Sequence, residues 1–169
     1  MARTSKASKN TVHYAIRPAD LALHVFEVTL TIASPDPAGQ VVSLPAWIPG
    51  SYMIREFARN IVQIRAECNG RKLRLAKLDK HSWRAARCDG ALVLHYQVYA
   101  WDLSVRAAHL DQTHGFFNGT STFLQVHGQE ALPHVVEILP PDDADGSAAF
   151  AGWRVATSLR ELKARRHRF

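Results

Sequence analysis

The chain has 169 residues, a formal net charge of +6 and a mean hydropathy of −0.16. This length allows one domain that buries about 70% of the surface of its unfolded chain, which is enough for a hydrophobic core. No apolar run approaches the roughly 20 residues that a membrane-spanning helix needs, and the first residues, MARTSKASKNTVHY, lack the apolar stretch of a secretory signal. The sequence therefore predicts a single domain with no membrane contact and a cytoplasmic location.

The positive charge gathers at the two ends of the chain. Three basic residues lie in the first ten and another basic run ends the sequence, whereas residues 11–153 carry a net negative charge. Nucleic-acid binding usually requires basic residues clustered on one face of the folded body. The basic run within residues 55–87 is explained by polar positions that alternate along solvated strands. We therefore expect residues 1–10 to form a flexible basic tail, and we expect no nucleic-acid partner.

Alternation of apolar and polar residues dominates the first half of the chain. The segment HVFEVTLTI alternates strictly, which predicts a strand that covers a core with one face. The turn residues 35–39 end this pattern, and it resumes at residues 41–44. The core residues expected from the first strand are Phe26, Val28, Leu30 and Ile32.

Two hairpins are predicted between residues 61 and 100. The pair Asn69-Gly70 separates the alternating runs IVQIRAE and KLRLAKL, and this dipeptide accepts the positive φ angles of a type I′ turn. A second turn at residues 88–90 separates the runs 82–87 and 91–100. In the first hairpin, the side chains expected to point inward are Val62, Ile64, Leu73 and Leu75, and those expected to face water are Gln63, Arg65, Lys72 and Arg74.

The two cysteines, Cys68 and Cys88, do not form a CxxC pair that would suggest zinc or redox chemistry. They could face each other across neighbouring strands. In a cytoplasmic protein, however, two reduced thiols are favoured over a disulfide.

The second half of the chain has a weaker pattern. The polar connection of residues 102–122 is long for a loop, which favours a functional segment, and the pair Phe116-Phe117 argues against disorder. Ser158 and Glu161 fit the two ends of a capping box and predict the start of a helix. Further strands are expected at residues 122–126, 135–139 and 153–157. The predicted fold is mostly β, an antiparallel β-sandwich or saddle-like sheet with a short C-terminal helix.

Nine histidines prompt a search for metal ligands. His127, Glu130 and His134 lack the i, i+4 spacing of a helical zinc motif, and Gly128 and Pro133 oppose a helix there.

A second group, His109, Asp111 and His114, could coordinate a cation in a loop, but this spacing is common by chance. No HExxH motif, GxSxG motif or phosphate-binding loop occurs in the sequence. We therefore expect no metal, no cofactor and no catalytic residue in this chain.

The aromatic residues could line a pocket or plug the open ends of a sandwich, and packing in the core is favoured. A stand-alone β-sandwich module that binds carbohydrate or peptide is the alternative function that such a pocket would support. The residues concerned are Trp47, Tyr52, Phe57, Trp101, Phe116 and Phe117.

Four unusual strings occur in order along the chain. They are LPAWIPGSYMIREFARNI at residues 44–61, DKHSWR at 79–84, YAWDLSVR at 99–106 and GFFNGTSTFL at 115–124. With these strings, the sequence resembles the N-terminal β domain of the PDZ-carrying glycyl aminopeptidases, a family of zinc metallopeptidases. The resemblance extends over nearly the whole chain, from residue 13 to residue 157.

The resemblance implies that residues 11–157 form a non-catalytic N-terminal β domain. Residues 158–169 would be a truncated linker or helix that leads toward a zinc catalytic domain, and a PDZ domain would follow. The zinc cofactor would belong to that catalytic domain, so this chain alone would be inert. The implied partners are the chain's own downstream domains and a peptide substrate at the domain edge.

Two sets of residues follow from the resemblance. The candidates for contact with the substrate are Phe117, Asn118, Gly119 and Glu130. The candidates for docking against the catalytic domain are Trp47, Tyr52, Met53 and Phe57.

Overall fold

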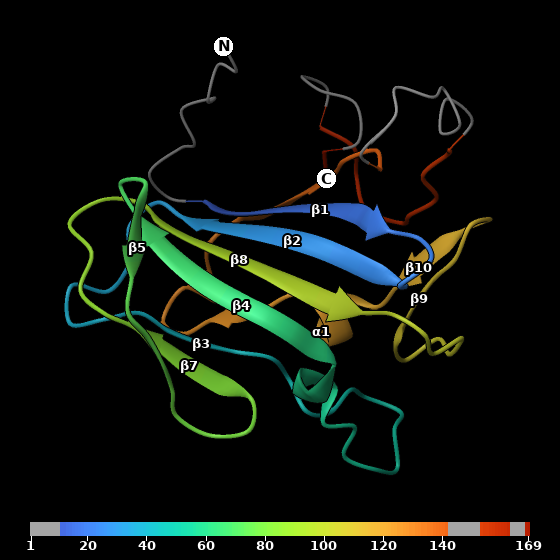
Figure 1. The fold of residues 1–169 in the computed structure, drawn as a ribbon, viewed down its shortest axis with the longest axis horizontal. Helices are drawn as coiled ribbons and strands as arrows, with labels where there is room; N and C mark the ends of the chain where they lie inside the picture. The colour runs from blue at the N-terminus through green and yellow to red at the C-terminus, as the bar shows by residue number, and fades with distance from the viewer. Residues whose placement is uncertain (1–10, 142–152, 163–167) are drawn as a thin grey trace.

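Two β-sheets enclose the core in the computed structural model, which describes residues 11–141, 153–162 and 168–169 (Figure 1). The predicted basic tail lies outside these residues. Most of the regular structure is β-strand, which confirms the mostly β fold predicted from the alternation of apolar and polar residues. Within the described residues, none of the helices combines the length and apolar character needed to cross a membrane.

The larger sheet has six strands in the order β12-β1-β2-β8-β4-β5. The pair β12–β1 is parallel, and the other neighbouring strands are antiparallel. The bounds are β1 Val12–Asp20, β2 Val25–Ile32, β4 Ile61–Cys68, β5 Arg71–Leu73, β8 Leu92–Tyr99 and β12 His134–Ile138.

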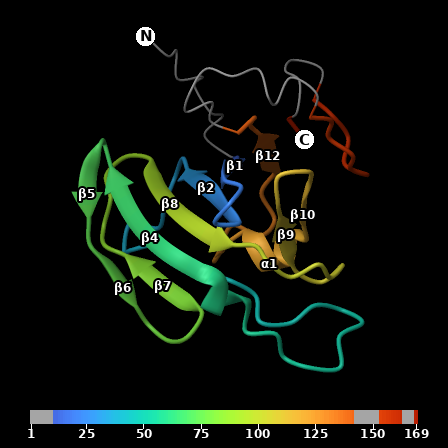
Figure 2. The same ribbon diagram turned by 45° about the vertical axis from the view of Figure 1, so that its right-hand side comes forward.

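A smaller antiparallel sheet has the order β11-β3-β7-β6, and a separate hairpin pairs β9 with β10. Two short helices, η1 and α1, lie in the connections (Figure 2). The bounds are β3 Val41–Ser43, η1 Phe57–Asn60, β6 Leu75–Lys77, β7 Ser82–Ala85, β9 Ala108–Leu110, β10 Gly115–Phe117, α1 Gly119–Thr122 and β11 Gln125–Val126.

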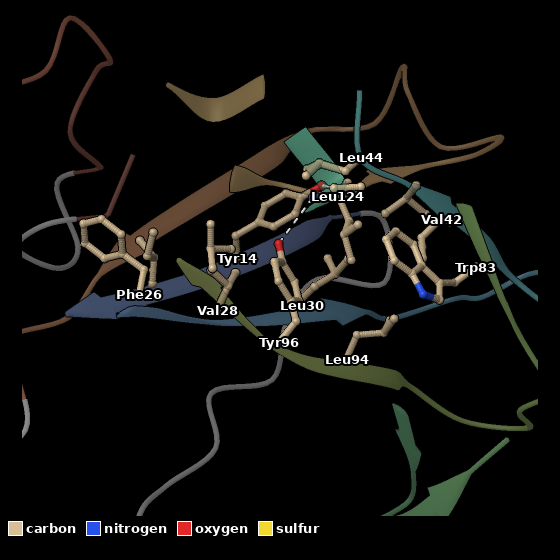
Figure 3. Packing of buried hydrophobic residues seen from close by; sticks show 14 of the residues in the cluster. Tyr14, Phe26, Val28, Leu30, Val42, Leu44, Trp83, Leu94, Tyr96 and Leu124 are labelled. Atoms are coloured by element: carbon tan, nitrogen blue, oxygen red, sulfur yellow. Dashed lines mark hydrogen bonds between the residues drawn. The ribbon is translucent and has the colours of Figure 1, made fainter. Parts of the chain in front are cut away.

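The core lies between the larger and the smaller sheet. Leu30 and Leu94 of the larger sheet face Val42 and Trp83 of the smaller one (Figure 3). Burying one such aliphatic side chain stabilises the fold by roughly 1.5–3 kcal/mol. The alternation in β2 is confirmed, because the exposed fraction is at most 3% at all four predicted core positions, Phe26, Val28, Leu30 and Ile32.

Two buried tyrosines attach the α1–β11 segment to the larger sheet. The Tyr14 hydroxyl donates to the carbonyl oxygen of Leu124 at 2.7 Å. The Tyr96 hydroxyl donates to the carbonyl oxygen of Thr122 at 3.0 Å and accepts from the Leu124 N–H at 3.3 Å. Burial raises the pKa of both phenols well above their ordinary value, because it disfavours the charged form. Both side chains are therefore neutral hydrogen-bonding groups inside the core.

The first predicted hairpin is confirmed at its turn. Asn69 and Gly70 have φ angles of 51° and 74°, as a type I′ turn requires, and they connect β4 to β5. The prediction that Val62 points inward is wrong, because its side chain is 65% exposed. The pairing of β4 with β8 shifts register between Ile61 and Gln63, so Val62 is the extra residue of a bulge and leaves the alternation.

The second predicted hairpin is wrong. β7 pairs with β3 and β6 in the smaller sheet, whereas β8 pairs with β2 and β4 in the larger one. The connection between them, residues 86–91, passes from one sheet to the other. The run KLRLAKL is divided in the same way, because β5 belongs to the larger sheet and β6 to the smaller.

The two cysteines form a disulfide, so the expectation of reduced thiols is wrong. Cys68 is the last residue of β4, and Cys88 lies in the connection that crosses between the sheets. The bond therefore links that crossing connection to the larger sheet.

The C-terminal predictions fail in the described residues. Residues 153–157 form no strand and residues 158–162 form no helix. The Leu162 N–H donates to the carbonyl oxygen of Arg168 at 2.7 Å, so no helical turn closes on Ser158. The N–H and carbonyl of Phe169 instead exchange two 2.8 Å hydrogen bonds with Val136 of β12. Residues 163–167 lie outside the described residues, and the short α-helix that the structure does contain is α1.

Three further strand predictions have different outcomes. The strand at 41–44 is confirmed as β3, and the strand at 135–139 is confirmed as β12 with a shift of one residue at each end. The strand at 122–126 is reduced to Gln125–Val126, because Thr122 ends α1.

Candidate functional site

Asn118 holds the junction between β10 and α1. Its side-chain oxygen accepts from the Thr120 N–H at 3.0 Å, which is the contact of a helix N-cap. Its amide nitrogen donates to the carbonyl oxygen of Val105 at 3.3 Å, and its backbone N–H donates to that of Ala107 at 2.9 Å. Asn118 therefore fixes the loop of residues 101–107 against the start of α1, where Gly119 is the first helical residue.

Phe117 is half-buried and packs in an aromatic cluster. Its ring meets Phe26 and Phe123 edge-on, with centroid distances of 5.7 Å and 5.5 Å. The side chains of Phe117 and Asn118 are thus used in internal contacts. The groups that this segment can offer to a ligand are mainly backbone groups around Gly119.

Glu130 lies elsewhere in the molecule. Its exposed carboxylate accepts a hydrogen bond from Gln125 at 3.2 Å. The backbone N–H groups of Glu130 itself and of Gly128 hold the pKa of this carboxyl below its ordinary value, so it is anionic at neutral pH.

The turn that carries Glu130 is attached at the far end of β2 from Phe117. Gln129 donates to the carbonyl oxygen of Ser34 at 2.7 Å, beyond the end of β2, whereas Phe117 contacts Phe26 near the start of that strand. Phe26 and Ile32, the last residue of β2, are about 20 Å apart at about 3.4 Å per residue. The structure therefore brings Phe117, Asn118 and Gly119 together and does not bring the Glu130 turn to them.

Three of the four docking candidates are exposed. The exposed fractions are 50% for Trp47, 105% for Tyr52 and 60% for Met53. Phe57 is only 3% exposed, because it begins η1 and points into the core, so it cannot contact another domain. A large apolar residue in the sequence does not reveal which side of a turn it will occupy.

The loop that carries these residues is held in shape by internal hydrogen bonds. The Trp47 indole N–H donates to the carbonyl oxygen of Ser51 at 2.8 Å. The Ser51 hydroxyl donates to the carbonyl oxygen of Met53 at 2.8 Å, and the Arg55 N–H donates to that of Ala46 at 2.7 Å. The loop therefore has a defined structure that directs apolar side chains outward.

A second loop adds apolar surface that the sequence reasoning missed. Leu103 and Val105 are 73% and 74% exposed, and Trp101 is 53% exposed. Both loops leave the same end of the sandwich and flank α1 and η1 (Figures 1 and 2). We call the following residues the apolar end surface. They are Trp47, Tyr52, Met53, Ile54, Trp101, Leu103 and Val105.

His109, Asp111 and His114 come together in the β9–β10 hairpin. His109 Nε2 lies 3.0 Å from Asp111 Oδ2, and His114 Nδ1 lies 3.4 Å from Asp111 Oδ1. Among the described residues, this is the only group of three or more His, Cys, Asp or Glu side chains whose possible metal-ligand atoms all lie within 4.8 Å of one another. The alternative trio of His127, Glu130 and His134 is not gathered in this way.

Comparison with known proteins places the chain in a family. Residues 13–169 match the family described as Peptidase M61 N-terminal domain. Comparison with curated proteins gives no match. Among solved structures, an aminopeptidase N family protein from Idiomarina loihiensis is 48% identical, with a TM-score of 0.75 over 77% of this chain. The chain spans only 22% of the length of that protein.

An M1 zinc metallopeptidase from Deinococcus radiodurans is 12% identical, with a TM-score of 0.43. The match covers 78% of this chain and 32% of the metallopeptidase chain. This likeness is too weak to carry an argument. The family match over residues 13–169 agrees with the four strings in the sequence and with the β-rich fold. The chain belongs to the Peptidase M61 N-terminal domain family.

Proposed function

We propose that this chain is the non-catalytic N-terminal domain of a zinc-dependent aminopeptidase with a preference for N-terminal glycine. The zinc ion and the catalytic residues belong to a downstream domain, against which this chain packs. The observation that carries the proposal is the family match, together with a relative whose chain extends far beyond the matched part. A PDZ domain beyond the catalytic domain is part of the same proposal.

The apolar end surface is the place where the catalytic domain docks. It presents aromatic and aliphatic side chains on two loops that are fixed by hydrogen bonds, and large exposed apolar patches usually mark interaction sites. The outer face of the larger sheet, by contrast, carries charged and polar groups. Arg17 pairs there with Glu27, and His95 lies 3.2 Å from the Thr29 hydroxyl. The end surface is therefore better suited than that outer face for burial against another domain.

Contact with the substrate is a further part of the proposed role. The backbone around Gly119 lies close to the apolar end surface, because Asn118 is bonded to the loop of Val105. This position allows the segment Phe117–Gly119 to border a substrate site at the edge between the two domains. Glu130 could pair with a terminal ammonium group, but only at a different edge of the domain.

The test compares two proteins from the same gene. One is the 169-residue chain, and the other continues through the downstream sequence. With stoichiometric zinc and a glycyl substrate, we expect hydrolysis by the longer protein and none by the chain alone. Hydrolysis by the purified 169-residue chain would show that the non-catalytic assignment is wrong. Its absence from the longer protein would contradict the aminopeptidase assignment.

A further inference from the structure

We propose that His109, Asp111 and His114 form a binding site for one divalent transition-metal ion of the class of Zn²⁺, Co²⁺ and Ni²⁺. The sequence alone favoured no metal in this chain, because the HLDQTH spacing is common by chance. The folded hairpin adds what the spacing could not show, namely that the three side chains converge. The three ligands belong to this chain, so the proposal does not depend on a catalytic domain.

The distances between the ligand atoms fit such an ion. In a tetrahedral zinc site with bonds of about 2.0–2.1 Å, ligand atoms lie about 3.4 Å apart. Asp111 Oδ2 lies 3.0 Å from His109 Nε2, and the other oxygen of the same carboxylate, Oδ1, lies 3.4 Å from His114 Nδ1. All three ligand atoms lie within 4.8 Å of one another, so a shift of about 1 Å would complete the shell. The His114 side chain is 52% exposed, and an ion bound at its Nδ1 atom would replace the 2.9 Å contact of that atom with the Thr113 hydroxyl.

The carboxylate of Asp111 is held in place for this task. Its Oδ1 atom accepts hydrogen bonds from the Thr113 hydroxyl at 2.7 Å, the Thr113 N–H at 2.6 Å and the His114 N–H at 2.9 Å. These three bonds hold the carboxylate group in one orientation. Asp111 is therefore a fixed anion, and its Oδ2 atom points toward His109.

The imidazole of His109 is held by its surroundings. The residue is only 6% exposed, and its ring stacks on Trp101 with a centroid distance of 4.9 Å. Trp101 in turn stacks on His24 at 3.7 Å. The Nδ1 atom of His109 is buried and has no hydrogen-bond partner among the described residues. Binding of an ion through Nε2 requires the neutral tautomer of His109 that carries its single proton on Nδ1, so that proton moves from Nε2 to Nδ1 and none is released.

The site has space for the remaining ligands of an ion. Asp111 and Thr113 line a shallow surface hollow of about 370 Å³, together with His24 and Gln112. His109 and His114 do not line this hollow, but the His114 and Asp111 side chains are 52% and 27% exposed, so water molecules can complete the coordination from the solvent side. Two imidazole nitrogens and one carboxylate oxygen favour Zn²⁺, Co²⁺ or Ni²⁺ over Mg²⁺ and Ca²⁺, which prefer oxygen ligands alone.

The experiment titrates the purified 169-residue chain with Co²⁺, followed by visible absorption, and with Zn²⁺, followed by calorimetry. We expect one equivalent to bind with a dissociation constant below about 10 µM. The informative variant is His114→Ala, because His114 is exposed and its loss should leave the fold intact. The matched control is His81→Ala, because His81 also lies near a carboxylate, with Nδ1 3.7 Å from Asp79 Oδ1.

We expect His114→Ala and Asp111→Asn to weaken binding at least about tenfold and His81→Ala to leave it unchanged. Circular dichroism of each variant separates a lost ligand from a lost fold, and His114→Ala decides the result if Asp111→Asn unfolds. Binding that is weaker than millimolar overturns the proposal. Binding that is equally tight in the wild type and in His114→Ala also overturns it, since another histidine would then hold the ion.

Discussion

The hydroxyl of Tyr96 satisfies two backbone groups at once. It donates to Thr122 and accepts from Leu124, whereas the hydroxyl of Tyr14 makes a single bond, to Leu124. Removing a hydroxyl leaves a buried backbone group without its partner, which costs about 1–3 kcal/mol. We expect Tyr96→Phe to lower the free energy of unfolding by this amount and Tyr14→Phe to lower it less. Urea denaturation measures both, with Tyr99→Phe as the control because Tyr99 is 42% exposed.

The same two tyrosines predict how stability depends on alkaline pH. Burial raises the pKa of Tyr14 and Tyr96 in the folded protein, while in the unfolded chain they titrate near pH 10. Above that pH the unfolded state loses protons that the folded state keeps, so the free energy of unfolding falls as pH rises. We expect denaturation midpoints to decline above pH 10 and to decline less steeply in the double variant Tyr14→Phe/Tyr96→Phe. Equal slopes in both proteins would contradict this account.

The disulfide between Cys68 and Cys88 closes a loop with a sequence separation of 20 residues. A bond that closes a loop of this length stabilises a fold by about 3 kcal/mol, because it restricts the unfolded chain. We expect a reducing agent to lower the melting temperature of the wild type. It should have no effect on Cys68→Ala/Cys88→Ala, whose melting temperature should match that of the reduced protein.

The state of these cysteines also bears on location. Disulfides persist in oxidising compartments and are rare in the cytoplasm. Trapping of free thiols in cells that express the natural protein tests whether the disulfide seen in the structure is also formed there. Free thiols would agree with the cytoplasmic prediction, and a disulfide would contradict it.

At the scale of elements, the β4–β5 hairpin depends on one glycine. Gly70 has a φ angle of 74°, a region that a residue with a Cβ atom rarely adopts. We expect Gly70→Ala to lower the free energy of unfolding by about 1 kcal/mol, although nothing within 4 Å would meet the added methyl group. Asn69→Gly is the control, because glycine also accepts the φ of 51° at that position. A Gly70→Ala variant as stable as the wild type would show that the turn can change its type.

The sequence predicted individual strands and turns better than it predicted which strands pair with each other. The alternation in β2 identified the buried side of that strand. The pair Asn69-Gly70 identified the turn between β4 and β5. Both signals are local in sequence. The same alternation could not show that residues 75–77 and 82–85 leave the larger sheet for the smaller one. Which sheet a strand joins is decided by contacts between residues that are far apart in sequence, such as Trp83 with Val42.

The C-terminal segment shows tertiary contacts prevailing over a local signal. The spacing of Ser158 and Glu161 is that of a capping box, but such a signal is a weak preference. In the folded protein, Phe169 pairs with β12 and the Leu162 N–H bonds to Arg168. In the candidate site, likewise, the resemblance suggested four docking candidates but could not show that one of them, Phe57, is buried. It also missed Leu103 and Val105, whose exposure depends on a loop fixed by the distant Asn118.

At the scale of the whole molecule, substitutions in the apolar end surface distinguish side chains that stabilise this domain from side chains that bind it to the proposed catalytic domain. Tyr52 is fully exposed and Met53 is 60% exposed, so neither belongs to the core of this chain. We therefore expect Tyr52→Ser/Met53→Ser to change the free energy of unfolding of the 169-residue chain by less than about 0.5 kcal/mol. In the longer protein, the same substitutions should remove buried apolar contacts between domains and lower both the melting temperature and the rate of hydrolysis.

The control for this prediction is Leu78→Ser, an exposed apolar residue that follows β6 and lies outside the apolar end surface. It should leave both the chain and the longer protein unchanged. If Tyr52→Ser/Met53→Ser also leaves the longer protein unchanged, the catalytic domain docks elsewhere. Loss of stability in the 169-residue chain itself would instead mean that these side chains support the loop from within. The comparison of the two proteins thus assigns the exposed side chains either to the domain or to its interface.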